Sequence, residues 1–270
     1  MTTARPVFFL SDHTGITAEI IGKSLLSQFP GEAFSITSLP FVDSMEKVNF
    51  AVQQICAAWK ETSLKPFVYS TMTDPRARAA LDACGAMVMD VYGHFLGMMI
   101  GEIGYPPEPL RGRFHGVDDP NSYRSRIDAV NFALAADDGL STDKYQHADL
   151  ILVGVSRSGK TPTSLYMAMQ YSLCVANYPL TPENFEQHGL PQSLMPFHSK
   201  LRGLTLAPER LAQIRSERRP NSQYASIENC RHELKLAEEL MRNEEIPVVD
   251  SSHRSVEEIA AIIKHSIKSE

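Results

Sequence analysis

The sequence has few cysteines, and they lie too far apart to form a recognisable pair. There are four in 270 residues, and no two of them make a C-x-x-C motif. Zinc sites and disulfide frameworks need cysteines at short, regular spacings, so the sequence predicts neither. Reduced thiols are typical of the cytoplasm, and we expect a cytoplasmic protein. The four are Cys56, Cys84, Cys174 and Cys230.

Long hydrophobic runs are also missing. No stretch approaches the roughly 18 uninterrupted apolar residues that a transmembrane helix needs. The first residues, MTTARPVFFLSD, lack the apolar core of a secretory signal peptide. We therefore expect no membrane partner.

The sequence has no excess of basic residues. It contains 26 Lys and Arg against 32 Asp and Glu, a net charge of −6. Proteins that coat nucleic acid usually show a strong basic excess, so we expect no nucleic-acid partner. One basic cluster occurs between residues 210 and 219, but Glu209 precedes it and Glu217 lies within it, which favours a solvent-exposed helix face. The cluster consists of Arg210, Arg215, Arg218 and Arg219.

Two common catalytic motifs are absent. The nine histidines form no H-E-x-x-H or similar metal-ligand spacing. No G-x-S-x-G motif occurs, so a serine hydrolase of the nucleophile-elbow type is not supported. What remains is a globular composition with 43% hydrophobic residues, long enough for one large domain or two modest ones.

The first part of the sequence alternates between strand-like and helix-like segments. Short apolar runs are separated by amphipathic stretches, with Ser44 and Asp74-Pro75 as helix-start signals. Such alternation predicts a mainly parallel sheet with helices on both faces. The expected strands are 7–10, 34–42, 66–72 and 86–91, and the expected helices are 14–29, 45–61 and one from 74.

A second α/β region follows a break rich in proline and glycine at 104–113. We expect an N-terminal α/β lobe at 1–104, a linker and connecting helix at 105–148, and a second α/β lobe at 149–270. The fold class is therefore α/β with two lobes of mainly parallel sheet. Expected strands in the second half are 149–153, 174–178 and 246–249, and expected helices are 122–136, 163–171, 208–219, 223–243 and 256–267.

One motif in the second lobe matches the phosphate-binding loop pattern G-x-x-x-x-G-K-[ST] in full. Its glycines let backbone N–H groups point at phosphate oxygens, its lysine reaches the outer phosphates and its last hydroxyl can hold Mg²⁺. An apolar strand precedes it and a helix follows, as the motif requires. The alternative is an ordinary glycine-containing turn between strand and helix. The predicted phosphate-binding residues are Gly154, Val155, Ser156, Arg157, Ser158, Gly159, Lys160 and Thr161.

Three groups of acidic residues are further candidates. Asp12 follows the first strand, where ligands bind in open α/β sheets, and could position a phosphate or accept a proton, or only cap a helix. Asp137 and Asp138 precede Gly139 and could hold Mg²⁺ or act as a base, or only end a helix. Asp250, after the last strand, could bind metal or cap the final helix.

Several segments in fixed order resemble one known family. They are SDHTGITAE (11–19), RIDAVNF (126–132), DDG (137–139), GVSRSGKTPTSLY (154–166), ANYP (176–179), GLT (203–205) and SVEEIA (255–260). Together they are similar to the bifunctional regulatory proteins of phosphoenolpyruvate synthase and of pyruvate, phosphate dikinase. The resemblance extends over nearly the whole sequence, so it is far more specific than the loop motif alone.

The resemblance implies two opposing reactions on one protein substrate. Such regulators phosphorylate a threonine of the dikinase with ADP, releasing AMP, and reverse this with inorganic phosphate, releasing diphosphate. Phe41, Ser193-Leu194 and His115-Gly116 are more similar to the branch that regulates phosphoenolpyruvate synthase, which is therefore the expected partner. The family also suggests a homodimer, and no family role is transferred to His13.

The resemblance and the motifs lead to one mechanistic hypothesis. Lys160 and Arg157 bind the transferred phosphate, Thr161 binds Mg²⁺, and Asp12 or Asp138 accepts the proton of the target threonine. The cofactors are ADP, with inorganic phosphate as co-substrate, and Mg²⁺. The loop alone would equally suit an ATP- or GTP-dependent kinase of a small metabolite, or a nucleotide-sensing protein without catalytic activity.

Overall fold

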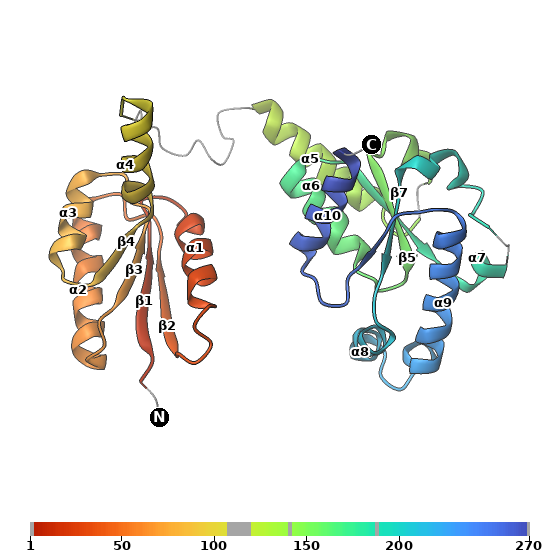
Figure 1. Cartoon of the computed structure of the whole chain (residues 1–270), viewed down its shortest axis with the longest axis horizontal. Coiled ribbons are helices and arrows are strands. Elements are labelled where there is room, and N and C mark those ends of the chain that lie inside the picture. The colour runs from red at the N-terminus through yellow and green to blue at the C-terminus, as the bar shows by residue number, and fades with distance from the viewer. Residues whose placement is uncertain (1–2, 107–119, 140–141, 187–188, 269–270) are drawn as a thin grey trace. The chain divides into compact units, whose positions relative to one another are not determined.

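The protein is an α/β chain that divides into two compact units, Met1–His115 and Gly116–Glu270. The computed structural model describes residues 3–106, 120–139, 142–186 and 189–268. Each unit contains one parallel four-stranded sheet with helices on it, which confirms the expected fold class (Figure 1). Within these described ranges, no helix has the length and apolar character that crossing a membrane requires.

The first unit has the strand order β2-β1-β3-β4, and all its pairs are parallel. Because the chain moves from β1 to one neighbour and then crosses to the other, the carboxyl ends of β1 and β3 form a topological switch point. The elements are β1 (Arg5–Leu10), α1 (Ile16–Leu26), β2 (Phe34–Leu39), α2 (Met45–Thr62), β3 (Phe67–Ser70), α3 (Pro75–Ala83), β4 (Met87–Asp90) and α4 (Val91–Ile103).

Alternating side chains of β1 pack against different helices. Val7 and Phe9 lie in a cluster with Ala18 of α1, and Phe8 and Leu10 lie in a cluster that includes residues of α2 and α3. Helix α1 therefore covers one face of the sheet, and α2 and α3 cover the other (Figure 1). The period of two along a strand explains this division.

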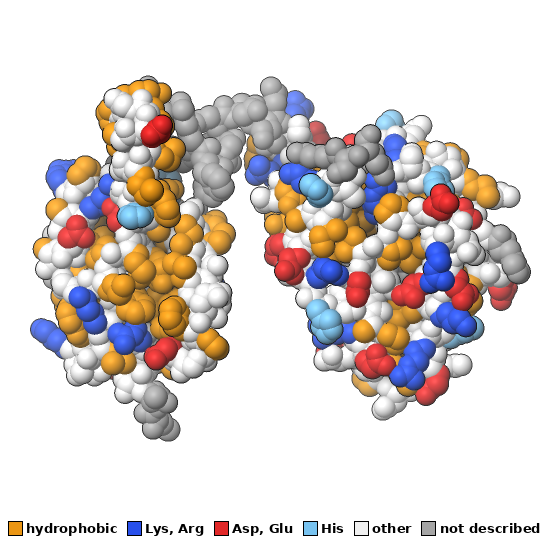
Figure 2. Space-filling model, viewed as in Figure 1, with side chains coloured by type: hydrophobic (Ala, Val, Ile, Leu, Met, Phe, Trp, Pro, Cys, Tyr) orange, Lys and Arg blue, Asp and Glu red, His pale blue; other side chains and the backbone are white. Residues whose placement is uncertain are grey.

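Helix α4 was not predicted from the sequence. Three glycines within it weaken any helical signal in the sequence. None of the residues from Val91 to Ile103 is buried in the part of the chain that the structure describes. Its apolar side chains contribute to the hydrophobic surface on this unit (Figure 2). Gly104, with φ of 85°, ends the helix. Residues 107–119 of the expected linker and connecting helix (105–148) lie outside the described residues.

The second unit repeats the same strand order, as β6-β5-β7-β8 in a parallel sheet. Its switch point is therefore at the carboxyl ends of β5 and β7. The elements are α5 (Pro120–Ala135), a 3-10 helix (Thr142–His147), β5 (Leu150–Val155), α6 (Lys160–Tyr171), β6 (Val175–Leu180), α7 (Pro182–Glu186), a 3-10 helix (Met195–Lys200), β7 (Leu201–Thr205), α8 (Pro208–Arg218), a 3-10 turn (Gln223–Ala225), α9 (Ile227–Asn243), β8 (Val248–Asp250) and α10 (Val256–Lys268).

The central strand β5 is buried along its whole length because helices cover both faces of this sheet. Leu150 and Leu152 pack in a cluster with residues of α6 and α10. Ile151, Val153 and Val155 pack in a cluster with residues of α8 and α9. A strand buried on both faces appears in the sequence as an unbroken apolar run, which explains why it was predicted.

Several elements of the second unit differ from the sequence-based expectation, among them α7, two of the 3-10 helices, β7 and the start of α9. Strand β7 was not predicted, because it contains Arg202 and Gly203, and its burial depends on neighbours distant in sequence. The helix expected at 223–243 is interrupted: a 3-10 turn ends at Ala225, and Ser226 caps α9 by accepting a hydrogen bond from the Asn229 amide at 3.2 Å. Serine favours this capping position over a helix interior.

Candidate functional site

The predicted phosphate-binding loop, residues 154–161, connects β5 to α6 at the switch point of the second sheet. Gly154 lies so close to β7 that a Cβ atom would collide with the Leu204 carbonyl oxygen. Gly159 occupies the N-cap of α6 with φ of 93°, a conformation that favours glycine. Arg157, although not glycine, has φ of 76°. The two glycines of the motif are thus required by backbone geometry.

Lys160 begins α6, and its side chain lies folded against the loop. The residue is 4% exposed, and its Nζ donates hydrogen bonds to the carbonyl oxygens of Gly154 at 3.1 Å and Val155 at 2.8 Å. Burial lowers the pKa of Lys160 to about 8, although the carboxylates of Asp138 and Asp137 oppose the shift. A buried cation at a helix N-terminus is well suited to binding an anion.

Thr161 contacts a carboxylate that sequence analysis did not select as the principal candidate. Its Oγ1 donates a hydrogen bond to Oδ1 of Asp137 at 2.9 Å. The same Oδ1 accepts a hydrogen bond from Nδ2 of Asn177, a fully buried residue of β6. Asn177 also accepts a hydrogen bond from the Asp138 amide through its Oδ1, at 3.1 Å. The two acids therefore follow α5 at a turn that Asn177 fixes beside the loop.

Thr161 and Asp137 are the residues that fit a magnesium ion. Mg²⁺ in nucleotide sites is typically held by one or two protein oxygens together with phosphate oxygens and water. A hydroxyl and a carboxylate oxygen 2.9 Å apart supply such a pair. Among the described residues, no cluster of three or more His, Cys, Asp or Glu side chains is suited to a metal ion.

Asp138 lies at the same turn after α5 as Asp137, but its environment is different. It is exposed, and its φ of 52° is in the left-handed region, which aspartate tolerates better than most residues. It lines a cavity of about 780 Å³ that also contains the loop, the start of α6 and residues 251–254. Its carboxylate is therefore accessible to a molecule in that cavity.

The cavity contains several cationic side chains in addition to Lys160. Arg157 comes from the loop, Arg210 and Arg218 from α8, and Arg254 from the segment after β8. This arrangement favours polyanionic ligands with two or more phosphates.

Asp250 is not the cap of α10, because Ser255 and Glu258 cap that helix. The Ser255 hydroxyl accepts a hydrogen bond from the Glu258 amide at 3.3 Å, and the Glu258 carboxylate accepts one from the Ser255 amide at 2.8 Å.

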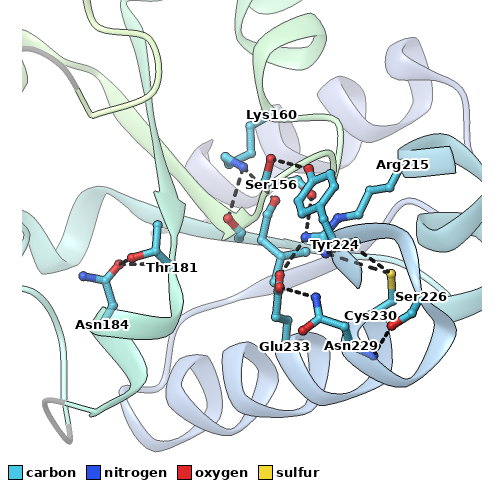
Figure 3. Close-up of polar contacts among 12 residues, drawn as sticks. Ser156, Lys160, Thr181, Asn184, Arg215, Tyr224, Ser226, Asn229, Cys230 and Glu233 are labelled. Atoms are coloured by element: carbon cyan, nitrogen blue, oxygen red, sulfur yellow. Dashed lines mark hydrogen bonds and ion pairs between the residues drawn. The ribbon is translucent and has the colours of Figure 1, made fainter. Parts of the chain in front are cut away.

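Arg215 is buried, although we expected the basic cluster that contains it to lie on a solvent-exposed helix face. Its side chain is fully buried, and Nη2 donates to Oε2 of Glu233 at 2.7 Å and to the carbonyl oxygen of Ser156 at 3.2 Å. Figure 3 shows that Arg215, Tyr224 and Glu233 converge beneath Ser156 of the loop. The expectation of a solvated helix face was wrong for this residue, because α8 packs against α9 through it.

Asp12 lies in the first unit, at the carboxyl end of β1. It is 8% exposed, and Oδ2 accepts a hydrogen bond from the Thr73 amide at 3.2 Å and another from the Thr73 hydroxyl. Its Oδ1 lies 3.1 Å from Nδ1 of His13. Burial raises the pKa of Asp12, but the bonds from Thr73 and His13 outweigh this, and the pKa is lowered overall. The carboxylate is thus held in its ionised form.

Comparison with known proteins identifies one family. The family model described as kinase/pyrophosphorylase matches residues 7–263. A protein from Aromatoleum aromaticum is 50% identical over 99% of this chain and 97% of its own length. Proteins from Azoarcus sp. and Ralstonia nicotianae are 49% and 47% identical, each over 98% of this chain and 96% and 95% of their own lengths. All three are named "Putative phosphoenolpyruvate synthase regulatory protein".

Proposed function

Because the chain belongs to the kinase/pyrophosphorylase family, we propose that it is a bifunctional regulator of phosphoenolpyruvate synthase. In one direction it transfers the β-phosphoryl group of ADP to a threonine of that enzyme, with release of AMP. In the other it transfers the phosphoryl group from phosphothreonine to inorganic phosphate, with release of diphosphate and the free threonine. The names of the similar proteins support this choice of partner.

The loop geometry is the main structural support for phosphoryl transfer. Such reactions need the phosphate positioned and its charge neutralised more than they need covalent catalysis. Lys160 and Arg157 supply positive charge, and the start of α6 supplies backbone N–H groups. In the forward direction the loop would bind the β-phosphate of ADP. In the reverse direction it would bind the attacking phosphate and then the diphosphate formed from it.

Mg²⁺, when bound, would neutralise part of the phosphate charge. Thr161 and Asp137 are the protein ligands that the structure supports for it. The proton of the target threonine needs an acceptor, and Asp138 in the cavity and Asp12 in the first unit are the candidates. Comparing Asp138→Asn with Asp12→Asn in ADP-dependent phosphorylation tests this: near-normal rates in both variants would exclude both acids as the base.

The decisive experiment combines the protein with purified phosphoenolpyruvate synthase and ADP. We expect phosphothreonine on the synthase, formation of AMP and loss of synthase activity. Addition of phosphate should then restore activity and release diphosphate. If the synthase is not phosphorylated with or without its own substrates present, the proposed function is wrong.

A lysine variant tests whether one site serves both directions. Lys160→Ala should abolish phosphorylation and its reversal, because the same cation binds phosphate in each. Lys235→Ala is the matched control, since Lys235 is an exposed lysine of α9 with 74% of its side chain accessible. If Lys160→Ala retained the phosphate-dependent reversal, the two reactions would use different sites.

The alternative is an ATP- or GTP-dependent kinase of a small metabolite. That enzyme would convert ATP to ADP, whereas the proposed regulator converts ADP to AMP. Product analysis by chromatography separates the two. The family description pairs a kinase with a pyrophosphorylase, and this pairing favours the regulator.

A further inference from the structure

Ser156, the third residue of the phosphate-binding loop, is held at two separate atoms by residues distant in the sequence. Its carbonyl oxygen accepts a hydrogen bond from Nη2 of Arg215 at 3.2 Å. Its hydroxyl shares a hydrogen bond of 3.0 Å with the hydroxyl of Tyr224. Figure 3 shows both contacts on the same side of the loop. Ser156 is thus fixed through its backbone and its side chain at once.

The two anchoring residues also fix each other. The guanidinium carbon of Arg215 lies 4.1 Å from the centre of the Tyr224 ring, and Nη1 donates to the Tyr224 carbonyl oxygen at 3.1 Å. Glu233 neutralises the guanidinium at 2.7 Å, and its other oxygen accepts a hydrogen bond from Asn229 at 2.7 Å. A buried cation is costly unless it is paired and hydrogen-bonded. The cluster pairs the charge and bonds both Nη atoms of Arg215, although its buried Nε has no hydrogen-bond partner. One of these donors is directed at the loop.

The residue after Ser156 explains why such anchoring would be needed. Arg157 has φ of 76°, a conformation that costs a non-glycine residue about 1–3 kcal/mol and persists only where surrounding contacts enforce it. On the far side of Arg157, the Ser158 carbonyl oxygen accepts a hydrogen bond from Ser251 at 3.2 Å. The left-handed turn at Arg157 is therefore fixed on both sides.

We propose that Tyr224 and Arg215 are positioning residues of the phosphate-binding loop, which hold Ser156 so that Arg157 and the loop amides are preorganised for the terminal phosphate of a nucleoside diphosphate. Neither residue contacts the ligand in this proposal. Their effect is to remove the ordering cost that a mobile loop would pay on binding. The proposal rests on the function proposed above, because it assumes that the loop binds a phosphate.

Tyr224→Phe tests the hydroxyl contact while keeping the ring beneath Arg215. We expect calorimetric titration to show ADP and diphosphate binding weakened by about 2- to 10-fold, the range for loss of one hydrogen bond. Tyr171→Phe is the matched control, because Tyr171 ends α6 and its ring contacts Lys264 rather than the loop. The control should bind as the wild type does. The melting temperature of each variant is measured in parallel.

A double-mutant cycle tests whether Tyr224 affects ADP binding through its contact with Ser156. Ser156→Ala should weaken binding by a similar factor, and the double variant with Tyr224→Phe should be no weaker than either single variant. Arg215→Lys retains the charge but cannot make all the contacts, so it should weaken binding further. If Tyr224→Phe lowers the melting temperature without changing ADP affinity, the residue is only structural and the proposal is wrong. If the wild type binds neither ADP nor diphosphate, the proposed function itself fails.

Discussion

The buried ammonium group of Lys160 should make anion binding by the loop depend on pH. Burial lowers the pKa of Lys160 from 10.5 to about 8, against the opposing effect of Asp138 and Asp137. A phosphate prefers the charged form, so the pKa must be higher in the complex than in the free protein. Above about pH 8, binding therefore requires the uptake of a proton. ADP affinity should fall as the pH rises through this region.

The size of the effect follows from the charged fraction of Lys160. With a pKa of about 8, most of the free protein carries the charge at about pH 7, and the charged fraction falls about tenfold per pH unit well above the pKa. ADP affinity should therefore fall several-fold between about pH 7.5 and about pH 8.5, and approach a tenfold loss per pH unit above that. The second pKa of a phosphoryl group is about 6, so the charge of the ligand hardly changes over this range.

Calorimetric titration at constant ionic strength, in buffers of different ionisation enthalpy, measures both the affinity and the number of protons taken up. Lys160→Arg is the control, because guanidinium stays charged throughout. Its affinity should not depend on pH, whatever its absolute value. The reasoning fails if wild-type affinity is constant across this range, or if Lys160→Arg shows the same decline.

Three further predictions concern the residues around the loop. Asp137→Asn removes the carboxylate beside Thr161, so Mg²⁺ should no longer strengthen ADP binding in titrations with and without the metal; an unchanged metal effect would exclude Asp137 as a ligand. Asn177→Ala removes a buried partner of Asp137, and urea unfolding should show a loss of about 1–3 kcal/mol. A smaller loss would mean that the turn can rearrange. Gly154→Ala places a methyl group against the Leu204 carbonyl and should lower stability by about 1–3 kcal/mol in thermal unfolding, whereas an unchanged midpoint would show that β5 and β7 can separate there.

Local signals in the sequence were sufficient for most of the fold. Strand β5 is an unbroken apolar run, and Ser44 and Asp74 cap α2 and α3 through their side chains, as their residue types predict. Strand β7 gave no such signal. Its Arg202 and Gly203 are unfavourable in a buried strand, and they are accommodated by neighbours elsewhere in the chain. Gly203, for instance, lies where a Cβ would collide with Met241 of α9.

The site was predictable only as far as it depends on contiguous residues. The loop motif lies at the switch point of the second sheet, and the Asp-Asp-Gly turn was singled out in the sequence as a separate acidic candidate. Which acid meets Thr161 depends on Asn177, which comes from a different strand and bonds to Asp137. Arg215 and Tyr224 are 59 and 68 positions from Ser156. Spacing carries no information about such pairs, so a buried arginine could not be told from an exposed one.

The shared strand order of the two sheets gives the Asp12 turn and the predicted phosphate-binding loop equivalent topological positions. β2-β1-β3-β4 and β6-β5-β7-β8 both have a switch point after the first strand of the unit. In the second unit that position has Lys160 at a helix start, whereas in the first unit it has Asp12, held by Thr73 and His13.

An ionised carboxylate repels phosphate and an ammonium group attracts it, so the two switch points present opposite charges to an anionic ligand. Because Asp12 is buried and its pKa is lowered, it is a weak base in the free protein, and a catalytic role would require the pKa to rise when substrate binds. Asp138 is exposed at the cavity beside the loop, where a substrate can reach its carboxylate. If the proposed transfer uses one of the two acids as its base, the structure therefore favours Asp138, and Asp12→Asn should affect the rate less than Asp138→Asn.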